Sequence, residues 1–272
     1  LQEETILLKN SLGRICSKNI YSNINSPPEN VSSMDGYALK YSNLQNINKI
    51  PIKIVGESAA GNPYIKKLNN YECVEIYTGA EVPKGANLIL LQERVIISSN
   101  HIVSTSQNYK KDQYVRKKSS NFKINSLIIK KNSLITSRTL GLAISSNHTK
   151  IHVYKKPNIA ILATGNELKN PNKHLSNAII SSNTPLLISL IKSFGGNAHD
   201  LGIAKDTLNS LMKKLQNINK FDILITTGGA SVGKHDLVKD VLNKLGMQLI
   251  FWKVAIRPGK PLIFGKLNKT LI

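Results

Sequence analysis

The sequence is poor in cysteine and has no long apolar run, and each shortage excludes a class of protein. Its 272 residues include two cysteines, Cys16 and Cys73, which lie far apart in sequence and form neither a metal-binding spacing nor a disulfide framework. A reducing, cytoplasmic setting is the simplest expectation. No apolar run has the length of a membrane-spanning helix, so we expect no membrane segment.

Acidic and aromatic residues are also scarce, and the charge balance bears on the choice of partner. Lysine and arginine number 37 against 16 acidic residues, a formal net charge of +21, whereas aromatic residues make up 6%. A strong positive charge can indicate nucleic-acid binding. However, the lysines are scattered, and no aromatic residues alternate with them to form a platform for base stacking. We therefore expect no nucleic-acid partner and a small anionic substrate instead.

Three zones with different patterns follow one another along the chain. Residues 1–24 predict a helix that ends at Gly13, followed by an extended stretch. Residues 25–122 contain short β segments separated by glycine, proline and asparagine, without a long helical period. Residues 126–146 are predicted to turn helical before the last zone begins near residue 155.

The last zone alternates predicted strands with predicted helices. Apolar runs predict strands at residues 158–164, 222–227, 248–255 and 261–267, and helical spacing predicts helices at residues 183–196, 206–215 and 236–246. Suitable N-caps are Asp206 and either Asn183 or Thr184. The alternation predicts an α/β fold with a mostly parallel sheet between two layers of helices. Ligands of such sheets bind at the carboxyl ends of the strands.

A glycine-rich stretch, TTGGASVGKHD at residues 226–236, follows one predicted strand directly. Glycine lets the backbone N–H groups approach a ligand closely, and Ser231 adds a hydroxyl. The helix that follows points its positive end at the same place, so the stretch predicts a cradle for a phosphate or another oxyanion. It is not a Walker loop, because no Gly-Lys-Ser/Thr ends it. The alternative is a tight strand–helix turn without a ligand.

Two carboxylates and a cationic turn complete the candidate site. Glu167, in the ATGNEL loop at residues 163–168, and Asp236 are predicted to share the edge of the sheet with the cradle, as a Mg²⁺ site would require. RPGKP at residues 257–261 forms a stiff turn whose Arg257 and Lys260 suit a small oxyanion, with Lys253 as a further candidate. The alternatives are an N-cap for Asp236, a solvated Glu167 and a solvated hairpin tip.

Six segments in this order resemble the molybdopterin molybdenumtransferase family, which includes the gephyrin E domain. They are PPENVSSMDGYALK, GESAAGNPY, YTGAEVPKGANLILLQE, KPNIAILATGNELKNP, TTGGASVGKHD and FWKVAIRPGKPLIFGKL, from near residue 26 to residue 267. The resemblance implies a discontinuous, mixed linker domain of residues 1–24 and 123–154, an elongated β domain of residues 25–122 and a molybdopterin-binding α/β domain of residues 155–272. Family sequences continue past FGKL into a further β domain, so we expect a C-terminal truncation, as a fragment or an eroded gene.

The resemblance also implies a homodimer, in which one subunit presents Asp35 and Thr78 to the α/β domain of the other. It implies catalytic roles for Asp35, Glu167, Asp206 and Asp236, of which Glu167 and Asp236 would hold Mg²⁺. It assigns binding of the pterin, its phosphates and molybdate to Thr78, Thr164, Gly165, Gly228, Gly229, Ser231, Gly233, Lys253, Arg257 and Lys260. The molybdopterin adenylyltransferase is a further expected partner.

The implied reaction inserts molybdenum from molybdate into adenylated molybdopterin, with release of AMP and with Mg²⁺ as the ion. Three positions depart from the family pattern: Asn121 and Ser181 stand where acidic residues are common, and Arg257 stands where lysine is common. The first alternative is therefore a catalytically impaired remnant or scaffold that still dimerises and binds pterin. The second is the adenylyltransferase, which shares the α/β domain but lacks the SMDGYA and β-domain segments.

Overall fold

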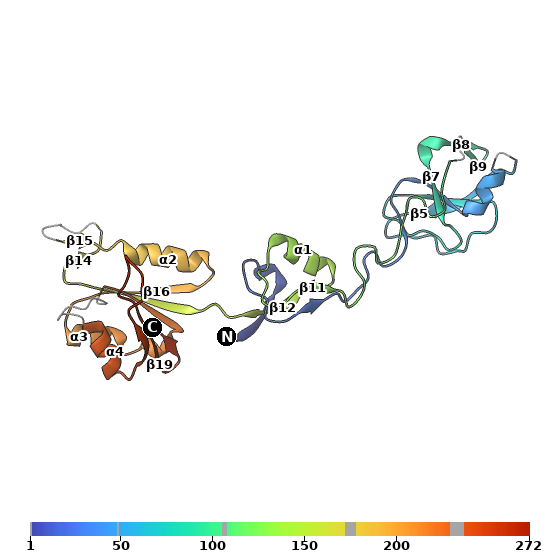
Figure 1. The fold of residues 1–272 in the computed structure, drawn as a ribbon. Coiled ribbons are helices and arrows are strands. Elements are labelled where there is room, and N and C mark those ends of the chain that lie inside the picture. Colours follow the sequence, from blue (N-terminus) through green and yellow to red (C-terminus); the bar gives the residue numbers. More distant parts are fainter. Residues whose placement is uncertain (1, 48, 105–107, 172–177, 229–236) are drawn as a thin grey trace. The chain divides into compact units, whose positions relative to one another are not determined.

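The structure is a computed structural model that describes residues 2–47, 49–104, 108–171, 178–228 and 237–272 (Figure 1). By its internal contacts, the chain divides into two compact units. One unit consists of Thr5–Val153, and the other consists of Leu1–Glu4 together with Tyr154–Ile272. Along the described chain, no helix combines the length and the apolar character that crossing a bilayer requires.

The Thr5–Val153 unit contains a small core built from its two ends. Strand β1 (Glu3–Leu7) pairs with β12 (Lys150–Tyr154), and β2 (Ile20–Tyr21) pairs antiparallel with β11 (Leu127–Ile129). A short 3-10 turn (Leu8–Asn10) follows β1, and helix α1 (Ser137–Ser145) follows β11. The buried side chains of these segments form one hydrophobic cluster that includes Leu8, Ile135 and Val153. Segments far apart in the sequence therefore share one core.

The helix predicted near the N-terminus is wrong, and the one at residues 126–146 is too long. Residues 3–7 form a strand that pairs with β12, and their side chains alternate between exposed and half-buried positions, as in any strand with one covered face. The N–H of Leu8 donates to the carbonyl of Thr149 at 2.8 Å, which fixes this pairing. Within residues 126–146, β11 comes first, and the helix begins after Thr136, whose hydroxyl accepts from the N–H of Thr139.

The rest of this unit is a β structure, as the punctuated middle zone predicts. A six-stranded sheet has the order β7-β4-β6-β5-β9-β8. Its strands are β4 (Gly36–Leu39), β5 (Ile52–Ser58), β6 (Glu72–Ile76), β7 (Leu88–Leu91), β8 (Val95–Ser98) and β9 (His101–Ser104). A short ribbon of β3 (Val31–Ser32) and β10 (Val115–Arg116) pairs beside it, and a 3-10 helix (Tyr41–Asn46) and a 3-10 turn (Gln92–Arg94) lie between strands. Both faces of β4 are buried, with Tyr37 and Leu39 in one cluster and Ala38 in another.

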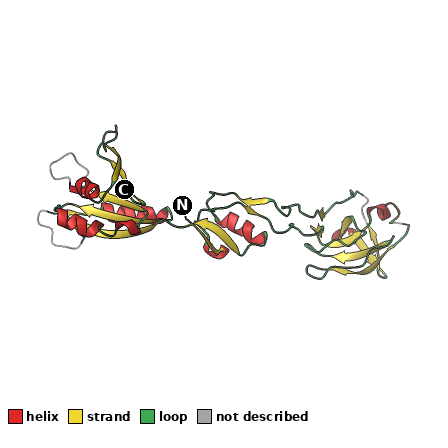
Figure 2. Ribbon diagram, turned by 90° about the horizontal axis from the view of Figure 1, so that it is seen from below, coloured by secondary structure: helices red, strands yellow, loops and turns green. Residues whose placement is uncertain are grey.

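The second unit is an α/β domain, which confirms the predicted fold class. Its six-stranded sheet has the order β16-β13-β17-β20-β19-β18. Figure 2 shows the red helices of this unit packed around its yellow strands. The strands are β13 (Asn158–Thr164), β16 (Asn197–Ala204), β17 (Ile223–Thr227), β18 (Gln248–Trp252), β19 (Ile263–Leu267) and β20 (Thr270–Leu271). Strand β13 runs parallel to both of its neighbours, and β17 runs parallel to β20, whereas β19 is antiparallel to both β18 and β20. A separate two-stranded pair joins β14 (Leu168–Lys169) to β15 (Ile179–Ile180).

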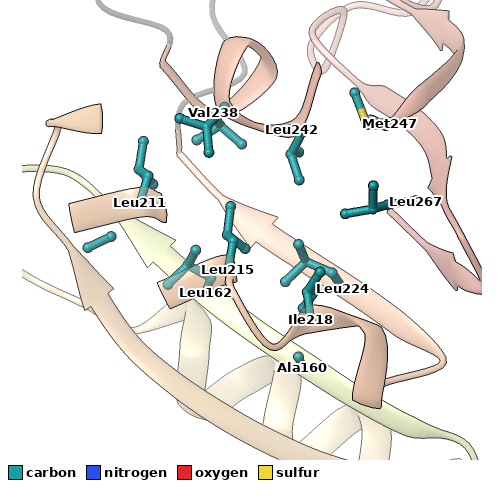
Figure 3. Packing of buried hydrophobic residues seen from close by; sticks show 12 residues of the cluster. Ala160, Leu162, Leu211, Leu215, Ile218, Leu224, Val238, Leu242, Met247 and Leu267 are labelled. Carbon is teal, nitrogen blue, oxygen red and sulfur yellow. The ribbon is translucent and has the colours of Figure 1, made fainter. Parts of the chain in front are cut away.

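Helices cover both faces of this sheet because alternate residues of β13 point to opposite sides. Ala160 and Leu162 belong to the cluster that packs against α3 (Leu208–Leu215) and α4 (Leu237–Lys244) (Figure 3). Ile159 and Ile161 instead pack with residues of α2 (Asn183–Ser193). The near-continuous apolar sequence of β13 thus reflects burial on both faces.

The N-caps of helices α2 and α3 differ from the prediction, and one strand was not predicted. Helix α3 is capped by Thr207, whose hydroxyl accepts from the N–H of Ser210 at 3.3 Å, and not by Asp206. Helix α2 begins at Asn183, with Ser182 in the N-cap position. Strand β16 was not predicted, because its polar residues Asn197, His199 and Asp200 interrupt the apolar run that would have indicated a strand.

An apolar groove lies beside the carboxyl-terminal half of β17. Strand β20 pairs with β17 at one residue pair, Ile223 with Leu271. A hollow of about 360 Å³ beside this pair is lined by Ile225 and Thr226 of β17, by Leu262 just before β19 and by Phe264 of β19. The carboxyl end of β17 is therefore flanked by β13 on one side and by this groove on the other.

We expect Leu215→Ala to destabilise the α/β unit by about 2–5 kcal/mol, because Leu215 is 1% exposed within the cluster of Figure 3. Met212→Ala on the same helix is the matched control, since its side chain is 38% exposed and should contribute about 1 kcal/mol or less. Urea unfolding followed through Trp252, the sole tryptophan of the chain, reports on this unit. Equal losses in the two variants would contradict the packing described.

Candidate functional site

The candidate site of the α/β unit is built from loops that leave one edge of its sheet. Strand β13 ends at Thr164, β16 at Ala204 and β17 at Thr227, and all three strands are parallel. Strand β18 also runs in their direction, because it is antiparallel to β19, which is antiparallel to β20. The residues that follow these four strands therefore reach the same edge, where α/β sheets bind their ligands.

The loops after β13 and β16 are tied together by a reciprocal pair of hydrogen bonds. The N–H of Asn166 donates to the Asp206 carboxylate at 3.1 Å, and the N–H of Asp206 donates to the Asn166 side-chain oxygen at 3.2 Å. The N–H of Gly165 also donates to the carbonyl of Ala204 at 3.3 Å. Asp206 is thus held in place by the neighbouring loop. Asn166, which sequence reasoning did not select, is the residue that holds it.

Glu167 folds back over Gly165. A Cβ added to Gly165 would lie 2.6 and 2.7 Å from the two carboxylate oxygens of Glu167, and the φ of Gly165 is +149°. A side chain at this position would therefore displace the carboxylate. The absence of a side chain at residue 165 keeps the acidic group close to the backbone at the end of β13.

Gly228 brings the end of β17 against the end of β13. A Cβ at Gly228 would lie 2.4 Å from the carbonyl oxygen and 3.1 Å from the hydroxyl oxygen of Thr164, and its φ of +86° favours glycine. The Thr164 hydroxyl is buried and has no hydrogen-bond partner within the described part of the chain. A buried hydroxyl without a partner is costly, so this group is suited to bind a polar ligand atom.

The basic turn follows β18 at the same edge. The N–H of Lys253 donates to the carbonyl of Leu262 at 3.0 Å, and the N–H of Val254 donates to the carbonyl of Lys260 at 2.9 Å, which closes the turn. The side chains of Lys253, Arg257 and Lys260 are all exposed. Lys253 has a φ of +80°, which is uncommon for a residue with a side chain and costs about 1–2 kcal/mol. Such backbone conformations occur often at binding sites.

Trp252 joins this turn to helix α4, a connection that the sequence did not predict. The ammonium group of Lys239 lies 3.8 Å from the centroid of the Trp252 ring, and that of Lys253 lies 4.2 Å from it. Both distances are within the range of cation–π attraction. The only sequence signal was that Trp252 is the sole tryptophan.

The structure brings some of the predicted site residues into contact and leaves others apart. Thr164 adjoins Gly228, Gly165 adjoins Glu167, and Asp206 is bonded to the loop that carries them. The basic turn shares their edge through the topology of the sheet. The predictions for Gly229, Ser231, Gly233 and Asp236 lie outside the described residues. Among the residues that are described, no three His, Cys, Asp or Glu side chains form a metal-binding group.

Asp35 and Thr78 form a pair of their own in the Thr5–Val153 unit. The Asp35 carboxylate accepts from the N–H of Thr78 at 2.7 Å and from its hydroxyl at 2.8 Å. Asp35 precedes Gly36, where a Cβ would lie 1.9 Å from the carbonyl oxygen of Leu90, so Gly36 is required for the close packing of β4 on β7. The backbone bond from Thr78, and then the hydroxyl bond, lower the pKa of Asp35, so the carboxylate stays ionised.

Two of the three positions that depart from the family pattern, Asn121 and Ser181, have partners in the structure. The guanidinium group of Arg116 donates to the side-chain oxygen of Asn121, whose amide donates to the Ser26 hydroxyl at 2.9 Å. Ser181 is buried, with its hydroxyl 3.4 Å from that of Thr184. Asn121 therefore satisfies the neighbouring arginine without a negative charge.

Two protein families match the two parts of the chain. Residues 1–146 match the MoeA N-terminal region (domain I and II), and residues 160–271 match a probable molybdopterin binding domain. Together they cover almost the whole chain.

Curated relatives carry the name molybdopterin molybdenumtransferase. The protein of Haemophilus influenzae is 34% identical over 99% of this chain and 66% of its own length. The protein of Nostoc sp. is 30% identical over 92% of this chain and 58% of its own length. The chain thus spans about three fifths to two thirds of the length of these relatives.

Solved structures of MoeA proteins have the same fold as this chain. A molybdopterin biosynthesis MoeA protein from Pyrococcus horikosii is 28% identical and superimposes with a TM-score of 0.88 over 99% of this chain and 69% of its own. A second structure, also of a MoeA protein, has a TM-score of 0.82 at 23% identity, which supports the fold alone. The match of more than half the chain to the MoeA N-terminal region, together with these likenesses, shows that the chain belongs to the MoeA family.

Proposed function

We propose that this chain takes part in inserting molybdenum into adenylated molybdopterin with release of AMP, as a transferase of molybdenum cofactor biosynthesis. The observation that carries the proposal is the shared sheet edge in the α/β unit. Backbone without side chains, a hydroxyl without a partner, two carboxylates and a cationic turn all follow strand ends at this edge. The names of the relatives support the same reaction.

The end of β13 suits the phosphate groups of the substrate. The Thr164 hydroxyl lacks a partner in the described chain, and the absence of a side chain on Gly228 lets the end of β17 lie against Thr164. Backbone and hydroxyl donors of this kind bind phosphate oxygens.

The neighbouring carboxylates suit Mg²⁺, which prefers oxygen donors and is often held by one or two carboxylates together with phosphate oxygens. Glu167 would supply one carboxylate, and we propose Asp236 as the second. Asp206, which is bonded to Asn166, would order the loop beside them. The ion would offset the charge of the phosphates when bound. The chain's own residues would orient the phosphoanhydride for cleavage.

The basic turn suits molybdate. Arg257 and Lys260 carry positive charge on a short loop that is closed by the hydrogen bond from Val254, and Lys253 lies at the start of that loop. Arginine presents several donors in one plane, which fits the oxygens of a tetrahedral oxyanion. Substrate attraction would therefore come from the turn, and substrate orientation from the strand ends.

The proposed assembly is a homodimer in which Asp35 and Thr78 of one subunit serve the α/β unit of the other. The support is that several apolar side chains in the segments of the small core are exposed: Leu12 is 60%, Leu134 is 53% and Ile144 is 55% exposed. Exposed apolar groups on a folded surface often mark an interface. The molybdopterin adenylyltransferase remains a proposed transient partner, because it would supply the adenylated substrate.

The second candidate is a scaffold that dimerises and binds pterin without turnover. It is favoured by Asn121, which occupies a position where the resemblance implies an acidic residue. Its side-chain amide donates to the Ser26 hydroxyl, and its side-chain oxygen accepts from the Arg116 guanidinium group. The scaffold would bind the pterin but would release no AMP.

The first prediction of the transferase proposal is that the chain releases AMP from adenylated molybdopterin when molybdate and Mg²⁺ are added. Glu167→Gln should lower this rate by about 100-fold, because it removes charge stabilisation at the reacting phosphates. Asp240→Asn removes an exposed carboxylate of α4 and serves as the charge-matched control. Pterin binding without AMP release by the unaltered chain would favour the scaffold.

The second prediction concerns the ionisation of Asp35. A carbon-detected NMR titration should give a pKa for this carboxyl below its ordinary value, so that the bonds to Thr78 persist at neutral pH and are lost as the pH falls through the lowered pKa. Thr78→Val should raise the pKa part of the way, because the larger effect comes from the backbone N–H, which remains. An unchanged pKa in Thr78→Val would show that the hydroxyl contributes nothing.

The third prediction concerns assembly. Light scattering should give the mass of a dimer at micromolar concentration, and Leu134→Lys should shift the protein toward the monomer. Ile65→Lys is the matched control, because its side chain is 86% exposed in the β part of the same unit. If the unaltered chain is monomeric, or if both variants dissociate equally, this interface is wrong.

A further inference from the structure

We propose that Trp252 is a positioning residue that holds Lys239 and Lys253 together as a paired cationic site for a small oxyanion. The inference deepens the proposed function, on which it rests, and extends it to two residues, Trp252 and Lys239, that have no assigned role. The site joins helix α4 to the start of the basic turn.

The geometry of the ring carries the proposal. Both ammonium groups lie over Trp252, at 3.8 and 4.2 Å from the ring centroid, so they are no further apart than the sum of these distances. Two like charges this close repel each other. The negative face of the indole attracts each of them and thereby offsets part of that repulsion. Without the ring, we expect the two flexible lysine side chains to separate.

The pair is available to an anion because its charge is not neutralised within the described part of the chain. Among the described residues, no carboxylate lies within ion-pair distance of Lys239 or Lys253. Lys239 is half-buried and Lys253 is exposed, so an anion can reach the pair from solvent. The high positive charge of the chain adds to this attraction.

The backbone orients Lys253 toward the ring. Lys253 comes directly after Trp252, the last residue of β18, and has a left-handed backbone conformation. Its N–H donates to the Leu262 carbonyl, which holds the chain at this point. The indole N–H of Trp252 is buried and has no acceptor among the described residues, so hydrogen bonding to those residues does not fix the ring. Packing and the two ammonium groups therefore determine its orientation. The ring, in turn, fixes the positions of the ammonium groups.

The arrangement can be tested without any ligand by NMR of the full chain labelled with ¹³C-lysine. Ring currents should shift the ε-methylene protons of two lysines upfield. Lys239→Arg and Lys253→Arg should each remove one of these signals and thereby assign them. Trp252→Leu should return both signals to ordinary positions, whereas Phe251→Leu, the adjacent aromatic on the same strand, should leave them shifted. Persistence of the shifts in Trp252→Leu would overturn the proposal.

The function of the pair is tested by calorimetric titration with molybdate alone. Trp252→Leu should weaken binding by about five- to tenfold although it changes no charge, because it loses two cation–π contacts. Trp252→Phe keeps a smaller ring, should fold if Trp252→Leu does not, and should weaken binding by about two- to threefold. Phe251→Leu should stay within about twofold of the unaltered chain.

The outcomes separate this inference from the function on which it rests. If the unaltered chain binds molybdate and Trp252→Leu and Trp252→Phe bind it equally well, the positioning role of Trp252 is overturned and the molybdate site stands. If the unaltered chain binds no molybdate, both the paired site and the proposed substrate are overturned. A graded loss from tryptophan to phenylalanine to leucine, with unchanged binding by Phe251→Leu, supports the proposal.

Discussion

The parallel pairing of β13 with β16 and β17 is the constraint on which the candidate site depends. Because β13 is buried on both faces and hydrogen-bonded on both sides, its direction fixes the directions of its neighbours. Three strand ends therefore meet at one edge, and each is followed by a polar or glycine-containing loop. The Asn166–Asp206 pair and the close approach of Gly228 to Thr164 are consequences of this pairing.

The proposed function assigns to this edge two kinds of binding that have different physical requirements. In the proposed function, phosphate would be bound by the Thr164 hydroxyl, which has no partner among the described residues, and Gly228 lets the end of β17 lie directly beside it. Attraction of an oxyanion requires concentrated positive charge, which the turn after β18 provides. Trp252 connects the turn to helix α4 by attracting a lysine from each.

The α/β unit could be predicted from the sequence because its elements have strong local patterns. The apolar run of β13 and the helical spacing of Leu211 and Leu215 each indicate one element, and strand–helix alternation then indicates a mostly parallel sheet. The helix cap was misplaced by one residue because Asp206 is also a good capping residue. Its carboxylate instead accepts from Asn166, on a loop that local sequence could not place beside it.

The small core of the other unit could not be predicted from local sequence. The segment that forms β1 contains good helix formers, but its partner β12 lies far along the chain, and tertiary pairing outweighs helix propensity there. The contact of Lys239 and Lys253 with Trp252 escaped prediction for the same reason, since it joins a helix to a strand end. By contrast, the segments that resemble the MoeA family identified Asp35 and Thr78 together, and the structure bonds them directly.

The most direct test of the account is hydrogen exchange measured with and without adenylated molybdopterin. If the carboxyl edge is the binding site, the substrate should protect the amides of residues 163–168, 204–207, 226–228 and 253–260 together. The amino ends of β13 and β16 should exchange as before. Protection confined to those amino ends, or spread over only one of the four loops, would contradict the account.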